Sequence, residues 1–339
     1  MTEEGSLNLF QQQDANRRRT IWLIVCFVVF FAWLGFGGDY VYFLATAHAP
    51  PAEQHRVWWL GFVMVGLGAV LAWYAYRTGP EKVLWATGAE EVIEPADDQQ
   101  KRLVNVVEEM AIAAGVPRPR IWVVPDPDPN AFATGNDAAH AHVAVTRGLL
   151  DLCNRDELQA VIGHELGHVK NLDVRLMTTL AALVGAILLM RNGASRMFVG
   201  GRGGSGRGGR KSDLGPLVIL LLIAWILSWI LAPIITQLLA MAVSRKREYL
   251  ADAMGAQFTR NPLALARALE KIEGAGAPTT RIKSGAAHMC IADPLGGHLA
   301  EREGMLADVL TSHPPMAKRI AILKGMGYAQ LKREGGTIP

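Results

Sequence analysis

Hydrophobic residues gather in four long runs along the 339-residue chain. The run at residues 21–47 contains a single acidic residue, and the run at 57–76 contains no charged residue. Each is long enough to cross a hydrocarbon core, which needs about 20 residues of helix. The runs at 176–190 and 214–243 follow, and the former is short for a complete crossing. We therefore expect about four transmembrane or membrane-embedded helices.

Between the second and third runs, the pattern changes to that of a domain folded in water. Apolar side chains first recur at helical spacing, and Gly115, Val116 and Pro117 predict the end of this helix. Stretches rich in β-branched residues predict strands at 121–124 and 142–146. Residues 157–170 predict another helix. These residues therefore indicate a small sheet packed with helices.

The C-terminal part of the chain is mostly helical and amphipathic in pattern. We predict an α+β fold that is mainly helical, with a small sheet, attached to the membrane helices. The pattern divides the chain into an N-terminal anchor hairpin, two parts of one folded domain, and two hydrophobic segments with a glycine- and arginine-rich linker between these parts. The respective boundaries are residues 1–80 for the hairpin, 81–173 and 244–339 for the folded parts, and 174–243 for the segments between them.

Composition supports a membrane protein, because 50% of the residues are hydrophobic and only 19% are charged. Soluble domains carry roughly 25% charged residues. The net charge of +3 is too small to indicate a nucleic-acid partner, and we expect none. Cys26, Cys153 and Cys290 lie far apart and form no paired metal-ligand spacing.

The segment His164-Glu165-Leu166-Gly167-His168 carries the strongest chemical signal. Histidines four positions apart project from one face of a helix, so both imidazoles can reach one cation. Glu165 lies between them and is suited to take a proton from water as a general base. The apolar neighbours of the motif favour a half-buried helix over a solvated polar face. We therefore predict a zinc site with His164 and His168 as ligands.

A catalytic zinc site needs a third protein ligand, and the best candidate follows the fourth hydrophobic run. Glu248 and Asp252 are four apart on a predicted helix, so Glu248 could bind the metal while Asp252 orients a ligand histidine. The alternative is an exposed acidic pair offset by neighbouring arginines. His140 and His142 also share a spacing, but no further ligand lies nearby, and we interpret them as solvent-facing strand residues.

Taken together, these motifs resemble those of the HtpX-type membrane metallopeptidases, which are relatives of the CaaX prenyl endoproteases. The resemblance rests on four motifs in the family's order, at residues 130–135, 164–168, 247–252 and 313–315. It implies a zincin-like catalytic domain with one Zn²⁺ per chain.

The resemblance also implies roles for individual residues. Glu248 would be the third zinc ligand and Asp252 its supporting partner. Asn130 would lie near the substrate backbone beside an edge strand, and His313 would stabilise the oxyanion, with Arg319 assisting. Without the resemblance, Asn130 is an ordinary turn residue and His313 an ordinary residue at a helix start.

The function that follows is membrane-bound endopeptidase activity on peptides or unfolded membrane proteins, in quality control. One alternative is a dedicated prenyl-protein endoprotease. Those enzymes resemble a larger chamber built from many membrane helices, and four hydrophobic runs are few for it. Another is a catalytically silent membrane scaffold with a structural zinc. The presence of Glu165 favours an enzyme, because a structural site needs no base.

Basic residues near the membrane runs predict the orientation. Arg17, Arg18 and Arg19 precede the first run and predict that the N-terminus and the catalytic domain lie in the cytoplasm. The resemblance implies that the membrane is a bacterial inner membrane. Six basic residues within 191–213 conflict with this rule, because two complete crossings would place that linker outside. Either the first helices dictate the orientation, or the last two runs form a hairpin that does not cross completely.

Overall fold

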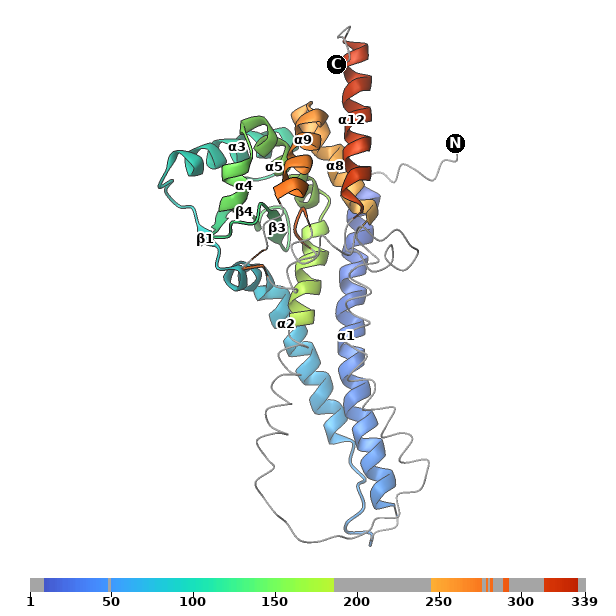
Figure 1. Ribbon diagram of the computed structural model, residues 1–339. Helices are drawn as coiled ribbons and strands as arrows, with labels where there is room; N and C mark the ends of the chain where they lie inside the picture. Colours follow the sequence, from blue (N-terminus) through green and yellow to red (C-terminus); the bar gives the residue numbers. More distant parts are fainter. Residues whose placement is uncertain are drawn as a thin grey trace. The chain divides into compact units, whose positions relative to one another are not determined.

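The computed structural model describes residues 9–47, 50–185, 245–275, 279, 281–282, 289–292 and 314–334. Contacts divide the chain into two compact units. The first, called here the sheet unit, comprises Met1–Thr20, Thr78–Ala181 and Leu238–Pro339. The second, called the hairpin unit, comprises Ile21–Arg77 and Ala182–Gln237. Figure 1 shows these elements, with labels where there is room.

The sheet unit contains a mixed sheet of four strands in the order β1-β2-β4-β3. Its strands are β1 (Glu90–Glu91), β2 (Arg120–Val124), β3 (Ala131–Gly135) and β4 (Ala141–Thr146). β2 runs parallel to β4, whereas β1 pairs with β2 and β3 pairs with β4 in antiparallel fashion. β1 and β3 are therefore the edge strands, and β3 is the one nearer the site described below. Its outer side forms an isolated bridge to Cys290 from Phe132.

Helices cover one face of this sheet. α3 (Asp98–Ala114) begins at Asp97, whose side chain accepts from the backbone of Gln100, and ends at Gly115 with φ +66°. This left-handed conformation favours glycine. α3 and α5 (Arg155–Lys170) pack their apolar faces into one core with alternate residues of the strands. The unit also contains α4 (Arg147–Leu152), α8 (Arg245–Thr259), α9 (Pro262–Ala275) and α12 (Met316–Arg333). Residues 173–181 are helical too, and Met177 and Ala181 pack with Phe132 and Ala144 on the other face of the sheet.

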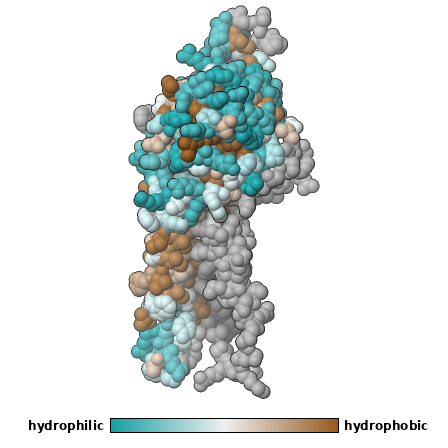
Figure 2. Space-filling view, turned by 90° about the vertical axis from the view of Figure 1, so that its left-hand side faces the viewer, coloured by the Kyte–Doolittle hydropathy of each residue, from teal (hydrophilic) through white to brown (hydrophobic). Residues whose placement is uncertain are grey.

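The hairpin unit consists, in its described part, mainly of two long helices. α1 (Leu9–Thr46) begins before this unit and ends within it, and α2 (Trp59–Thr87) begins within it and ends beyond it. Both helices are long and apolar enough to cross a membrane. Phe31 packs over Gly68, where an added Cβ would lie 2.8 Å from the Phe31 Cβ. Asp39 accepts from the backbone N–H of Gly61 at 2.7 Å and so binds the first turn of α2. In Figure 2, hydrophobic side chains gather along this hairpin.

The predicted fold is confirmed at the level of a mainly helical chain with a small sheet and two candidate membrane helices. Residues 173–185 are helical, and the rest of the third and fourth hydrophobic runs lies outside the described residues. The number of four membrane helices and the domain boundaries therefore stay predictions. The interpretation of His142 as solvent-facing was wrong: it is 6% exposed and accepts from Trp122 Nε1 at 3.1 Å, whereas His140 is exposed.

Candidate active site

The histidine motif lies on α5, a helix with a strongly specified start. Asn154 caps it by accepting from the backbone N–H of Glu157, and the Glu157 side chain accepts from the backbone N–H of Asn154 in return. Such a capping box satisfies donors that a helix start otherwise leaves unpaired. Three turns further on, His164 and His168 lie on one face with ring centroids 4.8 Å apart.

α8 packs against α5 at unusually short range, because small residues line the contact. A Cβ added at Gly255 would lie 2.9 Å from the backbone nitrogen of His164. At Gly167, an added Cβ would lie 3.3 Å from the Cα of Ala251. The two backbones can approach this closely only because side chains are missing at the crossing. This approach brings the acidic residues of α8 within reach of the histidines.

Three side chains converge as a result. His164, His168 and Glu248 each offer a ligand atom, and these atoms lie within 4.8 Å of one another. Glu248 Oε2 lies 3.7 Å from His164 Nε2, and Glu248 Oε1 lies 3.4 Å from His168 Nε2. Glu165 is 1% exposed and lines the same pocket as His168 and Glu248.

A second layer of charged groups surrounds His164. Asp252 Oδ1 lies 2.9 Å from His164 Nδ1, on the side of the ring opposite Nε2. Arg319 is completely buried and donates to both oxygens of Asp252, at 2.9 and 2.7 Å. It also lies 3.4 Å from Glu248 and donates to the carbonyl of Ile291 at 2.9 Å. Arg319 therefore holds the supporting carboxylate and the candidate ligand in place together.

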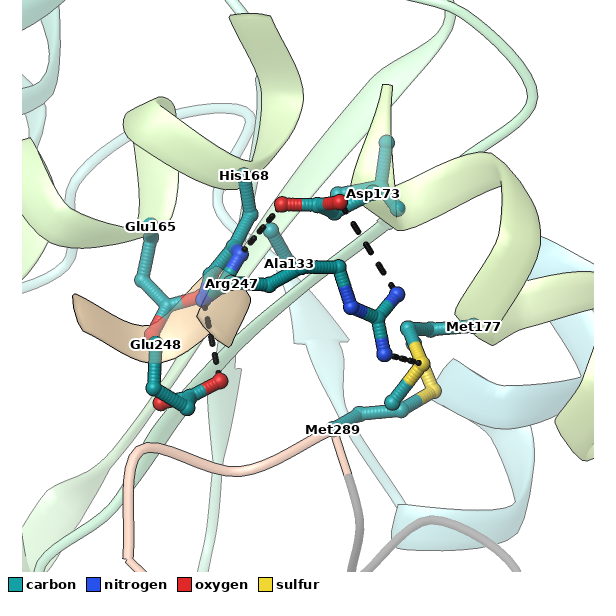
Figure 3. Close-up of a pocket in the computed structure, with 9 residues that line it drawn as sticks. Ala133, Glu165, His168, Asp173, Met177, Arg247, Glu248 and Met289 are labelled. Atoms are coloured by element: carbon teal, nitrogen blue, oxygen red, sulfur yellow. Dashed lines mark hydrogen bonds and ion pairs between the residues drawn. The ribbon is translucent and has the colours of Figure 1, made fainter. Parts of the chain in front are cut away.

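His168 has an equivalent partner that sequence reasoning missed. Asp173 Oδ2 lies 3.1 Å from His168 Nδ1, so the ring lies between Asp173 and Glu248, as Figure 3 shows. Arg247, which lies in the same pocket, approaches Asp173 to 3.8 Å and donates to the sulfur of Met177 at 3.1 Å. The sequence signal that could have indicated this partner is that Asp173 is an acidic residue shortly after the end of α5.

The electrostatics of the pocket are strongly perturbed. Burial raises the pKa of Glu165 to about 7, and the Glu248 carboxylate adds to this rise. Burial lowers the pKa of His164 although Asp252 opposes the change. Burial also opposes protonation of His168, but its contacts with Asp173 and Glu248 outweigh it and raise the pKa of His168 to about 10. The rise for His168 reflects two carboxylates that bracket one ring and attract positive charge.

The charges of the pocket fit a divalent cation. A metal requires neutral ligand histidines. In that state, and with Glu165 ionised, four buried carboxylates face two buried guanidinium groups and two negative charges remain unbalanced: Glu165, Asp173, Glu248 and Asp252 against Arg247 and Arg319. His164 Nε2 is buried and has no hydrogen-bond partner among the described residues. Buried polar atoms of this kind need an explanation, and a bound ion is one. Two imidazoles and a carboxylate are a donor set that zinc prefers.

The other predicted site residues lie in different surroundings. Asn130 is 1% exposed, and its side chain donates to the carbonyl of Ala292 at 3.0 Å and accepts from the backbone of Ala131 at 3.1 Å. It therefore connects the start of β3 to the segment beside it. His313 lies outside the described residues. The substrate roles of Asn130, His313 and Arg319 stay predictions.

A helix with two histidines and an intervening glutamate, joined by a carboxylate from a second helix, defines the metallopeptidase class. The model of "Peptidase family M48" matches residues 97–327. A "Protease HtpX homolog" of Caldanaerobacter subterraneus subsp. tengcongensis is 39% identical over 325 residues, covering 94% of this chain and 98% of the relative. Another, of Lactobacillus acidophilus, is 37% identical over 319 residues, covering 94% and 100%.

The chain belongs to peptidase family M48 and is a membrane metallopeptidase. The crystal structure of S. mikatae Ste24p is 20% identical with a TM-score of 0.44, covering 89% of this chain and 66% of that chain. A likeness at this level adds nothing to the assignment.

Proposed function

We propose that this chain is a zinc-dependent endopeptidase in which His164, His168 and Glu248 hold one Zn²⁺ and Glu165 is the general base. The observation that carries the proposal is the approach of three ligand atoms to within 4.8 Å of one another beside the buried Glu165. A catalytic zinc site has three protein ligands and an open position, which agrees with this set.

When bound, zinc would lower the pKa of water and polarise the scissile carbonyl. Glu165 takes a proton from the attacking water and returns it to the leaving amine. Asp252 holds His164 in the orientation in which Nε2 faces the metal position.

The substrate peptide would lie along the edge strand. The backbone of Ala133 in β3 lies close enough to the Glu165 carboxylate to affect its pKa, so the outer side of this strand faces the candidate base. Edge strands bind extended peptides through backbone groups that a neighbouring strand leaves free. Residues 290–291 pair with the first half of β3, so a peptide would use the rest of the edge or displace this segment.

Asn130 would support peptide binding by fixing the start of β3, since its buried side chain is bonded to Ala131 and Ala292. His313 would donate to the oxyanion. Arg319 would assist by holding Asp252 and Glu248 in position, because it is buried in contact with both.

In the cell, we expect the enzyme to cut misfolded or selected membrane proteins as part of quality control. Two candidate membrane helices support this expectation, because they would keep the enzyme close to such substrates. We propose a bacterial inner membrane because the relatives named above are bacterial proteins. We propose a cytoplasmic position of the catalytic residues because three arginines precede the first apolar run.

Proteolysis by purified protein in lipid vesicles tests the proposal. An unfolded membrane protein should be cut by the wild type, whereas Glu165→Gln should retain its zinc and lose about 10²–10⁴-fold in rate. Loss of zinc from this variant would instead make Glu165 a ligand. Cleavage of a prenylated peptide in preference to the unfolded protein would favour the prenyl-protein endoprotease. If the zinc-loaded wild type cuts neither substrate, the result would favour the catalytically silent scaffold with a structural zinc.

A further inference from the structure

Asp173 connects the metal-site pocket to the first membrane helix. One of its oxygens, Oδ2, faces His168 Nδ1 at 3.1 Å and accepts from Asn171 at 3.2 Å. The other, Oδ1, accepts from Asn16 Nδ2 at 2.7 Å. Arg247 lies farther away, at 3.8 Å from the same oxygen. The amide of Asn16 is therefore the nearest donor to Oδ1 among the described residues.

This contact is shielded from water on both sides. Asn16 is 2% exposed, Asp173 is 3% exposed and Asn171 is 1% exposed. A buried carboxylate needs donors, because water cannot solvate it there. Between Asn171 and Asp173 the backbone turns sharply at Leu172, whose φ of +59° is uncommon for a residue other than glycine. The chain thus adopts an unfavourable conformation at the point where it directs Asp173 back toward His168.

The first two turns of α1 act as a cap for the end of α5. Asn16 also donates to the carbonyl of Asn171 at 3.0 Å, and Gln13 donates to the carbonyl of Lys170 at 2.6 Å. The last carbonyls of a helix have no partner within it and need donors from elsewhere. Asn16 also donates to the side chain of Asp173. Gln13 donates to a backbone carbonyl instead.

We propose that Asn16 is a positioning residue of the metal site, which acts on His168 through Asp173. By fixing one oxygen of Asp173, Asn16 fixes the other oxygen, and this sets the ring orientation that presents Nε2 of His168 to the metal. The first membrane helix is then a component of the metal site as well as an anchor. The inference rests on the proposed role of His168 as a ligand.

The test is the Zn²⁺ affinity of the full-length protein in detergent, measured by competition with a chelating dye. Asp173→Ala should weaken binding by about 10–100-fold, the range for partners of ligand histidines. Asn16→Ala should weaken it by about 3–10-fold, because it acts one residue further away. Asn16→Asp keeps the shape but places an oxygen against Asp173, and it should lose more than Asn16→Ala.

Gln13→Ala is the matched control, because it removes an equivalent hydrogen bond from the same helix without touching Asp173. Its affinity should stay at the wild-type value, and the visible spectrum of its Co²⁺ form should not change. The Co²⁺ spectrum of Asn16→Ala should change. Unfolding of the metal-free proteins by circular dichroism shows that each variant is folded.

Two results overturn the inference. One is wild-type affinity in Asn16→Asp, and the other is equal losses in Asn16→Ala and Gln13→Ala, which would mean that α1 only docks. His168→Ala separates this failure from that of the proposed function. Wild-type affinity in His168→Ala would contradict the metal site itself and the inference with it.

Discussion

Glu248 and Asp252 lie one helical turn apart on α8, but their side chains meet different atoms of the candidate site. Glu248 faces the Nε2 atoms of both histidines, whereas Asp252 lies behind one histidine at Nδ1. We therefore predict that Glu248→Ala sharply lowers zinc affinity, because a ligand is lost. Asp252→Ala should lower it by only about 10–100-fold. Competition with a chelating dye measures both.

Asp252→Ala has a second expected effect, because it leaves the Arg319 guanidinium without its main partner. Burial opposes the charge of both groups, yet their attraction holds the pKa of Asp252 at about 2 and raises that of Arg319. A buried charge with no partner costs about 3–5 kcal/mol, and the loss here should be smaller because Glu248 still lies 3.4 Å from Arg319. The thermal midpoint of the metal-free protein should therefore fall in Asp252→Ala.

For Glu248→Ala, the contradicting result is a zinc content equal to that of the wild type, which would refute the assignment of the third ligand.

At the level of single residues, the convergence of His164, His168 and Glu248 was predictable. The spacing of the histidines is a helix-face pattern, and the resemblance singled out the glutamate. The roles of Asp173 and Asn16 were not predictable, because these residues are 157 positions apart and meet only in the folded chain. An isolated asparagine before three arginines looks like an ordinary polar residue beside a membrane helix.

At the level of elements, the contact between α5 and α8 controls the site geometry. We predict that Gly255→Ala moves the helices apart, because the new methyl group would lie 2.9 Å from the backbone nitrogen of His164. Such overpacking costs about 1–3 kcal/mol. The variant should have a lower thermal midpoint and weaker zinc binding, since Glu248 moves away from the histidines.

Gly325→Ala is the matched control for this prediction. Gly325 lies on α12, is exposed, and has no atom within 4 Å of an added Cβ. Alanine in an exposed helix interior is favoured over glycine by about 1 kcal/mol, so the midpoint should rise and zinc affinity should stay unchanged. Wild-type zinc affinity in Gly255→Ala would show that the site tolerates a wider helix separation.

Most elements of the sheet unit follow from local patterns. Gly115 ends α3, and the apolar stretches form β2 and β4 near the expected residues. The close helix crossing was harder to predict, although Gly163 and Gly167 share the four-residue spacing of Ala251 and Gly255. Such spacing indicates a close contact only once the partner helix is known. The burial of His142 depends on Trp122 of the neighbouring strand, which no local pattern indicates.

At the scale of the whole molecule, the N-terminal end of α1 indicates on which side of the membrane the candidate site lies. The sheet unit contains both the first turns of α1 and the candidate site, and Asn16 bonds directly to the end of α5. The N-terminal end of α1 and the candidate site therefore lie on the same side of the membrane. Arg17, Arg18 and Arg19 are exposed beside Asn16, and positive residues near a span favour the cytoplasm.

We predict that a cysteine at Ala96 is protected from a membrane-impermeant thiol reagent in intact cells. Ala96 is exposed in the sheet unit, so protection would reflect the membrane and not burial. The native cysteines are first replaced: Cys26 is exposed, and Cys153 is buried with a thiol pKa raised by burial to about 12. Labelling of Ala96→Cys from outside would invert the orientation.

A cysteine at Ser205 in the same background tests the basic linker, which lies outside the described residues. We expect labelling from outside, because residues 214–243 are ample for one crossing and residues 174–190 can form the other if Arg175 extends toward the headgroups. The described part of that segment is helical from 173 to 185, as a crossing requires. Cells opened with detergent provide the control, since both cysteines should then label. Protection of Ser205→Cys in intact cells together with labelling after opening would contradict two crossings. It would mean that six basic residues hold the linker in the cytoplasm and that the last two hydrophobic runs enter the membrane without passing through it.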